Sequence, residues 1–365
     1  MSVRHVLGIS GGKDSAALAI YMKTKYPDLD IDFYTCDTGK ELDETYQLIE
    51  NLEGFLEKKI TKLKAIASDH IDPFDFFVKI KGYFLPSSLV RWCTRSLKLE
   101  PFERYVGNEP TVSYVGIRGD ENREGYISTK SNIQSIFPFR RNIWSEEVIK
   151  TVLSNSKIEM VLDLFSSIDL ENRSARFLEL LGQPIGIDFP MHQKLDLILD
   201  LNIRDFNRLV FASLKETNYP LALENYFPLV EDDSNLVRDD IFRLLEESGV
   251  GVPAYYKKMP FEINGEKGEY SRSRSGCYFC FFQQRIEWVW LYEQHPDLYL
   301  KAMEYEKDGY TWGQNESLAE LIKPERIEQI KQEFIQKSKG VRKRSPLLLD
   351  VLDEEEEVGC AACFI

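Results

Sequence analysis

The sequence predicts an α/β fold in which helices cover both faces of a parallel sheet. Short apolar runs predict strands over residues 3–9, 31–35, 60–67 and 112–117. Between them, residues 15–25 and 42–58 carry apolar side chains at helical spacing. Strands that alternate with helices pair in parallel, and in such sheets ligands bind beyond the carboxyl ends of the strands.

Four regions are expected along the chain. Residues 1–143 form a nucleotide-binding α/β domain, and residues 144–222, rich in Leu, Ile, Asp and Glu without a chemical motif, form a helical insertion. Residues 223–310 return to the core and carry a C-x-x-C knuckle, with a helix over 283–294. Residues 311–365 form a Cys-rich C-terminal region, with a helix over 317–337 and an acidic tail.

Composition excludes some function classes. The chain has 365 residues and a formal net charge of −14, which argues against strong unaided nucleic-acid binding but leaves room for a local basic patch. No run approaches 18 apolar residues, so no membrane span is expected, and the first apolar run is too short for a signal peptide. We therefore expect a cytoplasmic protein.

A glycine-rich loop follows the first predicted strand. It reads Ser10-Gly11-Gly12-Lys13-Asp14-Ser15. The glycines let the backbone approach an anion, and the amides at the start of the next helix point at it. The common P-loop needs Ser or Thr directly after its Lys, whereas Asp14 follows Lys13 here. The loop predicts a phosphate site of another kind, with a plain structural turn as the alternative.

This loop resembles the S-G-G-x-D-S pyrophosphate-loop motif of the adenine-nucleotide α-hydrolase superfamily. The resemblance implies a HUP-like fold and cleavage of ATP to AMP and pyrophosphate through an adenylated intermediate. Mg²⁺ normally accompanies the triphosphate and offsets its charge.

Three further segments resemble phosphoadenosine-phosphosulfate-reductase-like proteins. They are Asp37-Thr38-Gly39 with Glu44-Thr45, Arg91-Trp92-Cys93-Thr94 with Leu97-Lys98 and Pro101, and Gly116-Ile117-Arg118-Gly119-Asp120-Glu121 with Arg123. The last Arg is shifted by one residue from the family pattern.

The resemblance implies a set of site residues. The candidate catalytic residues are Lys13, Asp14, Lys98 and Arg118, of which Lys98 and Arg118 would neutralise charge that develops at the cleaved bond. The candidate ATP contacts are Ser10, Gly11, Gly12, Lys13, Asp14, Ser15, Asp37, Gly116, Arg118 and Asp120. The alternatives are a turn cap for Asp37 and a surface ion pair for Arg118.

The six cysteines suggest a thiolate metal site. Cys277 with Cys280, and Cys360 with Cys363, form two C-x-x-C pairs, and no His clusters with them. Together with Cys93 they are the candidate ligands, in a set that suits zinc or an iron–sulfur cluster. The alternatives are a buried thiol for Cys93 and a mobile redox pair for the tail, while Cys36 is expected simply to be buried.

The cysteine arrangement is similar to that of the reductase-like ATP pyrophosphatases of DNA phosphorothioation systems. That resemblance implies a [4Fe–4S] cluster, with zinc as the alternative, adenylation of a DNA backbone phosphate, and a cysteine desulfurase partner that supplies sulfur. Partner subunits would help to hold the DNA. The alternatives are a tRNA thiolation enzyme, a sulfonucleotide reductase and a nucleotide-sensing protein without turnover. The founding reductases end in an E-C-G-L-H-like motif, which the Cys360-Ala361-Ala362-Cys363 ending lacks.

Overall fold

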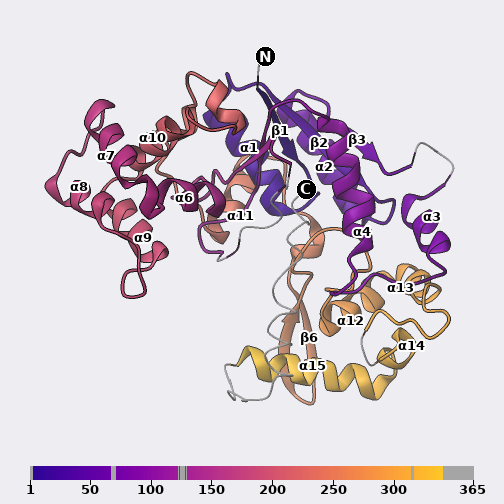
Figure 1. Cartoon of the computed structure of the whole chain (residues 1–365). Helices are drawn as coiled ribbons and strands as arrows, with labels where there is room; N and C mark the ends of the chain where they lie inside the picture. Colours follow the sequence, from indigo (N-terminus) through magenta and orange to yellow (C-terminus); the bar gives the residue numbers. More distant parts are fainter. Residues whose placement is uncertain are drawn as a thin grey trace.

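A five-stranded parallel sheet forms the centre of the protein (Figure 1). A computed structural model describes residues 3–66, 71–121, 123, 128, 130–313 and 316–339. The strands are β1 (Arg4–Gly8), β2 (Ile31–Asp37), β3 (Thr61–Lys64), β4 (Thr111–Tyr114) and β5 (Ile133–Ile136). Their order is β3-β2-β1-β4-β5, and every neighbouring pair is parallel. The predicted fold class is confirmed, and β5 is an additional strand that the apolar pattern did not reveal.

Helices cover both faces of this sheet, as predicted. Residues alternate between the faces along each strand, so that Leu7 and Phe33 join one core while Val6 and Tyr34 join another. The first core packs against α1 (Lys13–Lys25), α2 (Asp43–Leu56) and α11 (Arg238–Glu247). The second packs against α5 (Glu100–Val106).

A helical layer extends one side of the α/β core. It contains α6 (Glu146–Leu153), α7 (Ile158–Ser167), α8 (Ala175–Gly182), α9 (Met191–Leu201) and α10 (Ile203–Leu214), seen at the left of Figure 1. Ser145 and Ser174 each accept a hydrogen bond from the third amide of the helix that they precede, which explains where α6 and α8 begin. The apolar faces of these helices continue the core on the α1 side of the sheet.

The C-terminal part forms a second, aromatic lobe. It holds a hairpin of β6 (Met259–Ile263) and β7 (Glu266–Tyr270), followed by α12 (Arg285–Gln294), α13 (Pro296–Met303), α14 (Leu318–Leu321) and α15 (Pro324–Ser338). The predicted helix over 317–337 is therefore two helices, because Pro324 starts a new helix. Two segments of the N-terminal half, α3 (Pro73–Ile80) and α4 (Trp92–Thr94), pack into this lobe through Phe74 and Trp92.

Asp232 ties the segment after the insertion to α1. Its buried carboxylate accepts hydrogen bonds from Tyr21, from Tyr26 at 2.6 Å and from Lys25 Nζ at 2.6 Å. Burial by itself raises the pKa of this carboxyl group, but the bonds from Lys25 and the tyrosines outweigh burial and lower the pKa to about 2. The ionised form is therefore stabilised in the folded chain.

Replacing Asp232 by Asn should lower the free energy of unfolding at pH 7 by about 2 kcal/mol, because the variant loses the charge that Lys25 and the tyrosines bind. The lowered pKa of Asp232 stabilises the fold above the ordinary carboxyl pKa, and this contribution is lost as the pH falls toward about 2. The difference in the free energy of unfolding between the wild type and the variant should therefore become smaller as the pH is lowered from about 4. Urea titrations measure this, with the exposed neighbour Asp233→Asn as the control. Equal effects of the two substitutions would contradict the role of ionised Asp232 in stabilising the fold.

Candidate functional site

The loop after β1 forms the strand-to-helix turn that the motif predicts. Gly11 has a φ of +72°, and Gly12 is the extended residue that precedes α1. The helix begins at Lys13, so that the amides of its first turn have no partner within the helix. Ser15 Oγ lies 3.1 Å from Ser10 Oγ and donates to the Gly12 carbonyl oxygen at 3.1 Å. These bonds hold the loop closed around the helix start, where the helix dipole favours an anion.

Four of the predicted site residues meet at this helix start. Lys13 Nζ lies 2.8 Å from one oxygen of Asp14, and Arg118 Nη1 lies 2.9 Å from the other. Arg118 also contacts Asp120 at 2.8 Å and Glu121 at 3.2 Å. The Arg118 side chain is only 12% exposed, so the surface ion pair considered as its alternative does not describe it. Two cations thus lie beside the loop, each paired with carboxylates of the site itself.

Gly116 allows this arrangement by its lack of a side chain. A Cβ at this position would lie 2.9 Å from the carbonyl oxygen of Asp14. The chain leaving β4 therefore runs directly against the first turn of α1, which brings Arg118 within reach of Asp14. The strand predicted over 112–117 ends at Tyr114 for this reason: the following residues turn toward the helix instead of continuing the sheet.

A narrow cavity lies next to the loop, at the carboxyl end of β2. Ser10, Asp37, Glu41, Tyr46 and Lys98 are among its lining residues. Asp37 accepts hydrogen bonds from the Gly39 amide at 2.9 Å and from the Tyr46 hydroxyl at 3.2 Å, so it lines the cavity and also caps its own turn. The cavity has about 20 Å³ of space, room for a single water molecule.

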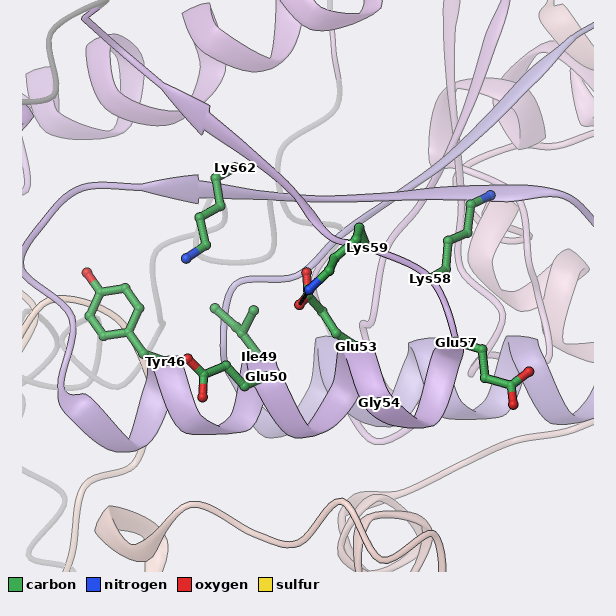
Figure 2. A pocket seen from close by; sticks show the side chains of 9 residues that line it. All are labelled: Tyr46, Ile49, Glu50, Glu53, Gly54, Glu57, Lys58, Lys59 and Lys62. Carbon is green, nitrogen blue, oxygen red and sulfur yellow. Dashed lines mark hydrogen bonds and ion pairs between the residues drawn. The ribbon is translucent and has the colours of Figure 1, made fainter.

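A wide groove of about 820 Å³ adjoins this cavity and shares Tyr46, Ile49 and Lys62 with it. Figure 2 shows Lys62, on β3, pointing across the groove toward Tyr46 and Glu50 on α2. The nearby Lys59 is paired with Glu53 at 2.7 Å. The groove connects the edge of the sheet with the cavity beside the loop.

Glu41 is a half-buried acidic residue that lines the cavity. It accepts hydrogen bonds from Thr38 Oγ1 at 2.6 Å and from the Tyr46 hydroxyl at 3.1 Å. Burial raises its pKa, the neighbouring Asp37 adds to this effect, and the Thr38 bond and Lys98 oppose it. Glu41 is not part of the sequence motifs, although it lies only two residues after the predicted Asp37–Gly39 turn.

A segment from the C-terminal half closes the loop from the other side. The Tyr255 hydroxyl donates to the Gly11 carbonyl oxygen at 3.0 Å, and the Tyr256 hydroxyl accepts from the Lys13 amide at 3.4 Å. Ser275 lies over Gly12, where a Cβ would come within 2.5 Å of the serine oxygen. No known pattern marks Tyr255 or Tyr256, so only the fold could show that they belong to the site.

Two arginines of the same segment carry donors without partners. Arg272 is 2% exposed and donates to the Cys277 carbonyl oxygen at 3.0 Å. Its Nε and Nη1 atoms, and Nη1 of Arg274, are buried and have no hydrogen-bond partner within the described part of the chain. Buried charged donors are costly unless they are satisfied, so they suit a site that receives an anion or water.

The described cysteines form a pair and not a complete metal site. Cys277 and Cys280 lie in one turn, where Cys277 Sγ is 3.3 Å from Thr38 Oγ1 and burial raises the pKa of the Cys277 thiol. Cys93, at α4, packs against the same aromatic cluster as Cys277. Cys36 is buried as predicted, and burial raises its pKa to about 12.

Zinc and [4Fe–4S] sites usually need four ligands. Among the described residues, no group of three or more His, Cys, Asp or Glu side chains is placed to hold a metal ion. Cys360 and Cys363 lie outside the described residues. The described residues alone therefore do not form a complete site for zinc or for a [4Fe–4S] cluster.

No helix in the described ranges is long and apolar enough to cross a membrane.

Comparisons with known proteins found similarity for the N-terminal part of the chain. Residues 4–161 match the family model of the phosphoadenosine phosphosulfate reductase domain. An uncharacterized protein of Methanocaldococcus jannaschii is 32% identical over 146 residues, which cover 36% of this chain and only 28% of that protein's length. The crystal structure of a phosphoadenylyl-sulfate reductase from Candida auris, in complex with phosphate, aligns with 41% of this chain and 71% of its own, at 18% identity and a TM-score of 0.30. Residues 4–161, which hold the loop, the sheet and Arg118, are therefore the part of the chain that is similar to the phosphoadenosine phosphosulfate reductase domain.

Proposed function

We propose that this site binds ATP and cleaves it between the α and β phosphates, releasing pyrophosphate and activating an oxygen for replacement by sulfur. The observation that carries the proposal is the placement of Lys13, Asp14 and Arg118 at the start of α1, directly behind the two loop glycines. A helix start whose first amides have no partner within the helix, together with two adjacent cations, favours a polyphosphate.

The roles follow from the charges of the site. The loop amides would bind phosphate oxygens, and Lys13 and Arg118 would exchange their carboxylate partners for the phosphates. Asp14 and Asp120, released from those cations, are then the candidates to bind Mg²⁺, which usually takes one or two carboxylates together with substrate phosphates. Lys98, which lines the adjoining cavity, would add positive charge near the cleaved bond.

The adenosine end would enter the cavity that Asp37 and Glu41 line. With room for a single water, that cavity must widen before a nucleoside can bind, and Gly276 is one of its walls. We therefore infer that the segment around Ser275 and Gly276 moves when ATP binds. The groove beside α2 would give the nucleotide its way in.

For the acceptor, we propose a nucleic-acid phosphate, with DNA backbone phosphorothioation as the setting. Adenylation of a phosphate oxygen would make AMP the leaving group. The terminal sulfur of a persulfide from a cysteine desulfurase partner would attack the phosphorus and displace AMP, and a second thiol would then cleave the S–S bond, which leaves the phosphorothioate and a disulfide. The support is the match to a family of sulfur chemistry, together with the thiol pair of Cys277 and Cys280 beside the nucleotide cavity.

The test is an assay of the products made from ATP. The purified chain is incubated with ATP, Mg²⁺ and a desulfurase, with DNA, tRNA or phosphoadenosine phosphosulfate in separate arms. AMP and pyrophosphate in equal amounts, with sulfur incorporated into DNA, is the expected result. Sulfur incorporated only into tRNA would move the setting to tRNA thiolation, and sulfite release would favour a reductase. ADP and phosphate, or no turnover in any arm, would refute the cleavage proposal.

We further propose that Cys277 and Cys280 bind a [4Fe–4S] cluster together with Cys93 and a tail cysteine, Cys360 or Cys363. Because the three described cysteines are not grouped to hold a metal ion in this structure, Cys93 would have to move toward the pair when the cluster forms. Anaerobically purified protein should then contain iron and sulfide and absorb visible light, and Cys277→Ser should lose most of the iron because a ligand is missing. Cys36→Ser is the matched control and should keep it. Colourless protein with one zinc per chain would show that the site binds zinc and not an iron–sulfur cluster. Protein without any metal would refute both proposals.

A further inference from the structure

Two arginines from distant parts of the sequence lie against one aromatic ring. The guanidinium carbon of Arg91 is 4.9 Å from the centre of the Phe282 ring, and that of Arg274 is 5.8 Å from it. Phe281 packs beside Phe282, with the ring centres 4.4 Å apart. We call Arg91, Arg274, Phe281 and Phe282 the arginine–phenylalanine cluster.

The cluster adjoins the proposed ATP site. Ser273, on one side of Arg274, is bound to Glu287, while Ser275, on the other, lies over Gly12 of the loop. Leu99 packs against Phe282 and ends the π-helical turn η1 (Arg95–Leu99), which carries Lys98 of the nucleotide cavity. A molecule that reaches the loop from this side would therefore meet the cluster.

The charge here differs from that of the whole protein. The chain has a formal net charge of −14, yet Arg91 and Arg274 both lie against the Phe282 ring. Lys98 directly precedes Leu99, which packs against the same ring. Arg95 is exposed nearby but is already paired with Glu100 at 3.2 Å. The Nη1 atom of Arg274 is buried without a partner among the described residues. Two guanidinium groups beside one ring, one of them with an unpartnered donor, are suited to phosphate.

We propose that the arginine–phenylalanine cluster is the docking surface for an unpaired nucleic-acid strand. Arg91 and Arg274 bind its phosphates, held in place by the ring beneath them, and the half-buried Phe281 offers a face for a base. Positive charge combined with aromatic faces is how proteins bind single strands without reading their sequence. The inference rests on the proposed function in one respect: the bound strand is taken as the acceptor of the adenylyl group.

The test is direct binding of fluorescent oligonucleotides to the full chain. One DNA and one RNA strand of the same sequence, and the DNA duplex, are titrated by fluorescence anisotropy over a series of salt concentrations. Arg91→Ala should weaken single-strand binding roughly tenfold, because a charged hydrogen bond to phosphate is lost. It should also reduce the slope of log K against log salt by about 0.7. Arg176→Ala, an exposed arginine on α8, is the matched control and should change neither value.

The outcomes separate this inference from the proposed function. If wild type binds no single strand, prefers the duplex, or keeps its affinity and salt slope in both Arg91→Ala and Arg274→Ala, the docking surface is wrong even when ATP is cleaved. If the strands bind as expected but ATP yields no AMP and pyrophosphate, the surface stands and the cleavage proposal fails. Stronger binding of one of the two single strands identifies the acceptor as DNA or RNA.

Discussion

Replacing Lys13 by Ala is expected to lower the rate of AMP and pyrophosphate formation by roughly 10²–10³-fold. Removing one preorganised group that stabilises charge in a transition state typically costs this much. In the structure Lys13 is buried at the start of α1, 2.8 Å from Asp14, so its ammonium group is already held beside the loop. The substitution also leaves Asp14 with Arg118 as its remaining cation, which further disfavours an incoming polyphosphate.

The rate of pyrophosphate formation and the affinity for ATP should both be measured for this variant. A lower rate with little change in the affinity for ATP would show that Lys13 stabilises mainly the transition state. A loss of both rate and affinity would show that Lys13 also binds the triphosphate before cleavage. Lys23→Ala is the matched control, because Lys23 is an exposed lysine in the last turn of the same helix. A Lys13→Ala protein that forms pyrophosphate within twofold of the wild-type rate would refute the assignment of the loop.

The sheet and the loop were predictable because their signals are local. The strand before Ser10 is a continuous apolar run and the helix after it has regular spacing, so the turn between them had to lie at the carboxyl end of a strand. Since parallel strands bring such ends together, the convergence of Asp14 and Arg118 could also be expected, and the structure places them 2.9 Å apart. Asp37 caps its own turn, as the alternative for it held, and it also lines the cavity, while its contact with ATP stays a prediction.

The other half of the site depends on contacts between distant residues. Tyr255 and Tyr256 reach the loop only because the chain returns after the insertion, and no spacing rule links them to Gly11 or Lys13. The hairpin of β6 and β7 has a signal in the sequence, the dipeptide Asn264-Gly265, and both residues have the positive φ that a two-residue hairpin turn requires. Apolar residues alternate along β6, but β7 has Tyr270 as its only large apolar residue, so no second strand could be predicted to pair with β6.

Replacing Gly11 by Ala should destabilise the fold by about 3 kcal/mol, through left-handed strain and overpacking. Gly11 has a φ of +72°, and a Cβ there would come within 2.2 Å of Thr45 Cγ2 on α2. Gly54→Ala is the control, and it is expected to change the stability in the opposite direction. Gly54 lies within α2 with nothing within 4 Å of its Cβ position, so alanine should stabilise the helix there by about 0.5–1 kcal/mol. Urea unfolding of the two variants measures both effects.

The contact between Gly11 and Thr45 makes a sharper prediction for the double variant. Thr45→Ser removes the methyl group that the new Cβ would meet but keeps the hydroxyl. In the wild-type background this loss of a buried methyl group should cost about 0.8 kcal/mol. In the Gly11→Ala background it should instead restore about 1–2 kcal/mol, because the overlap is relieved while the backbone strain remains. Effects that add within about 0.5 kcal/mol would show that Gly11 does not approach α2 as closely as the structure has it. Since that approach also sets the position of the loop amides, the double variant should recover part of any ATP binding that Gly11→Ala loses.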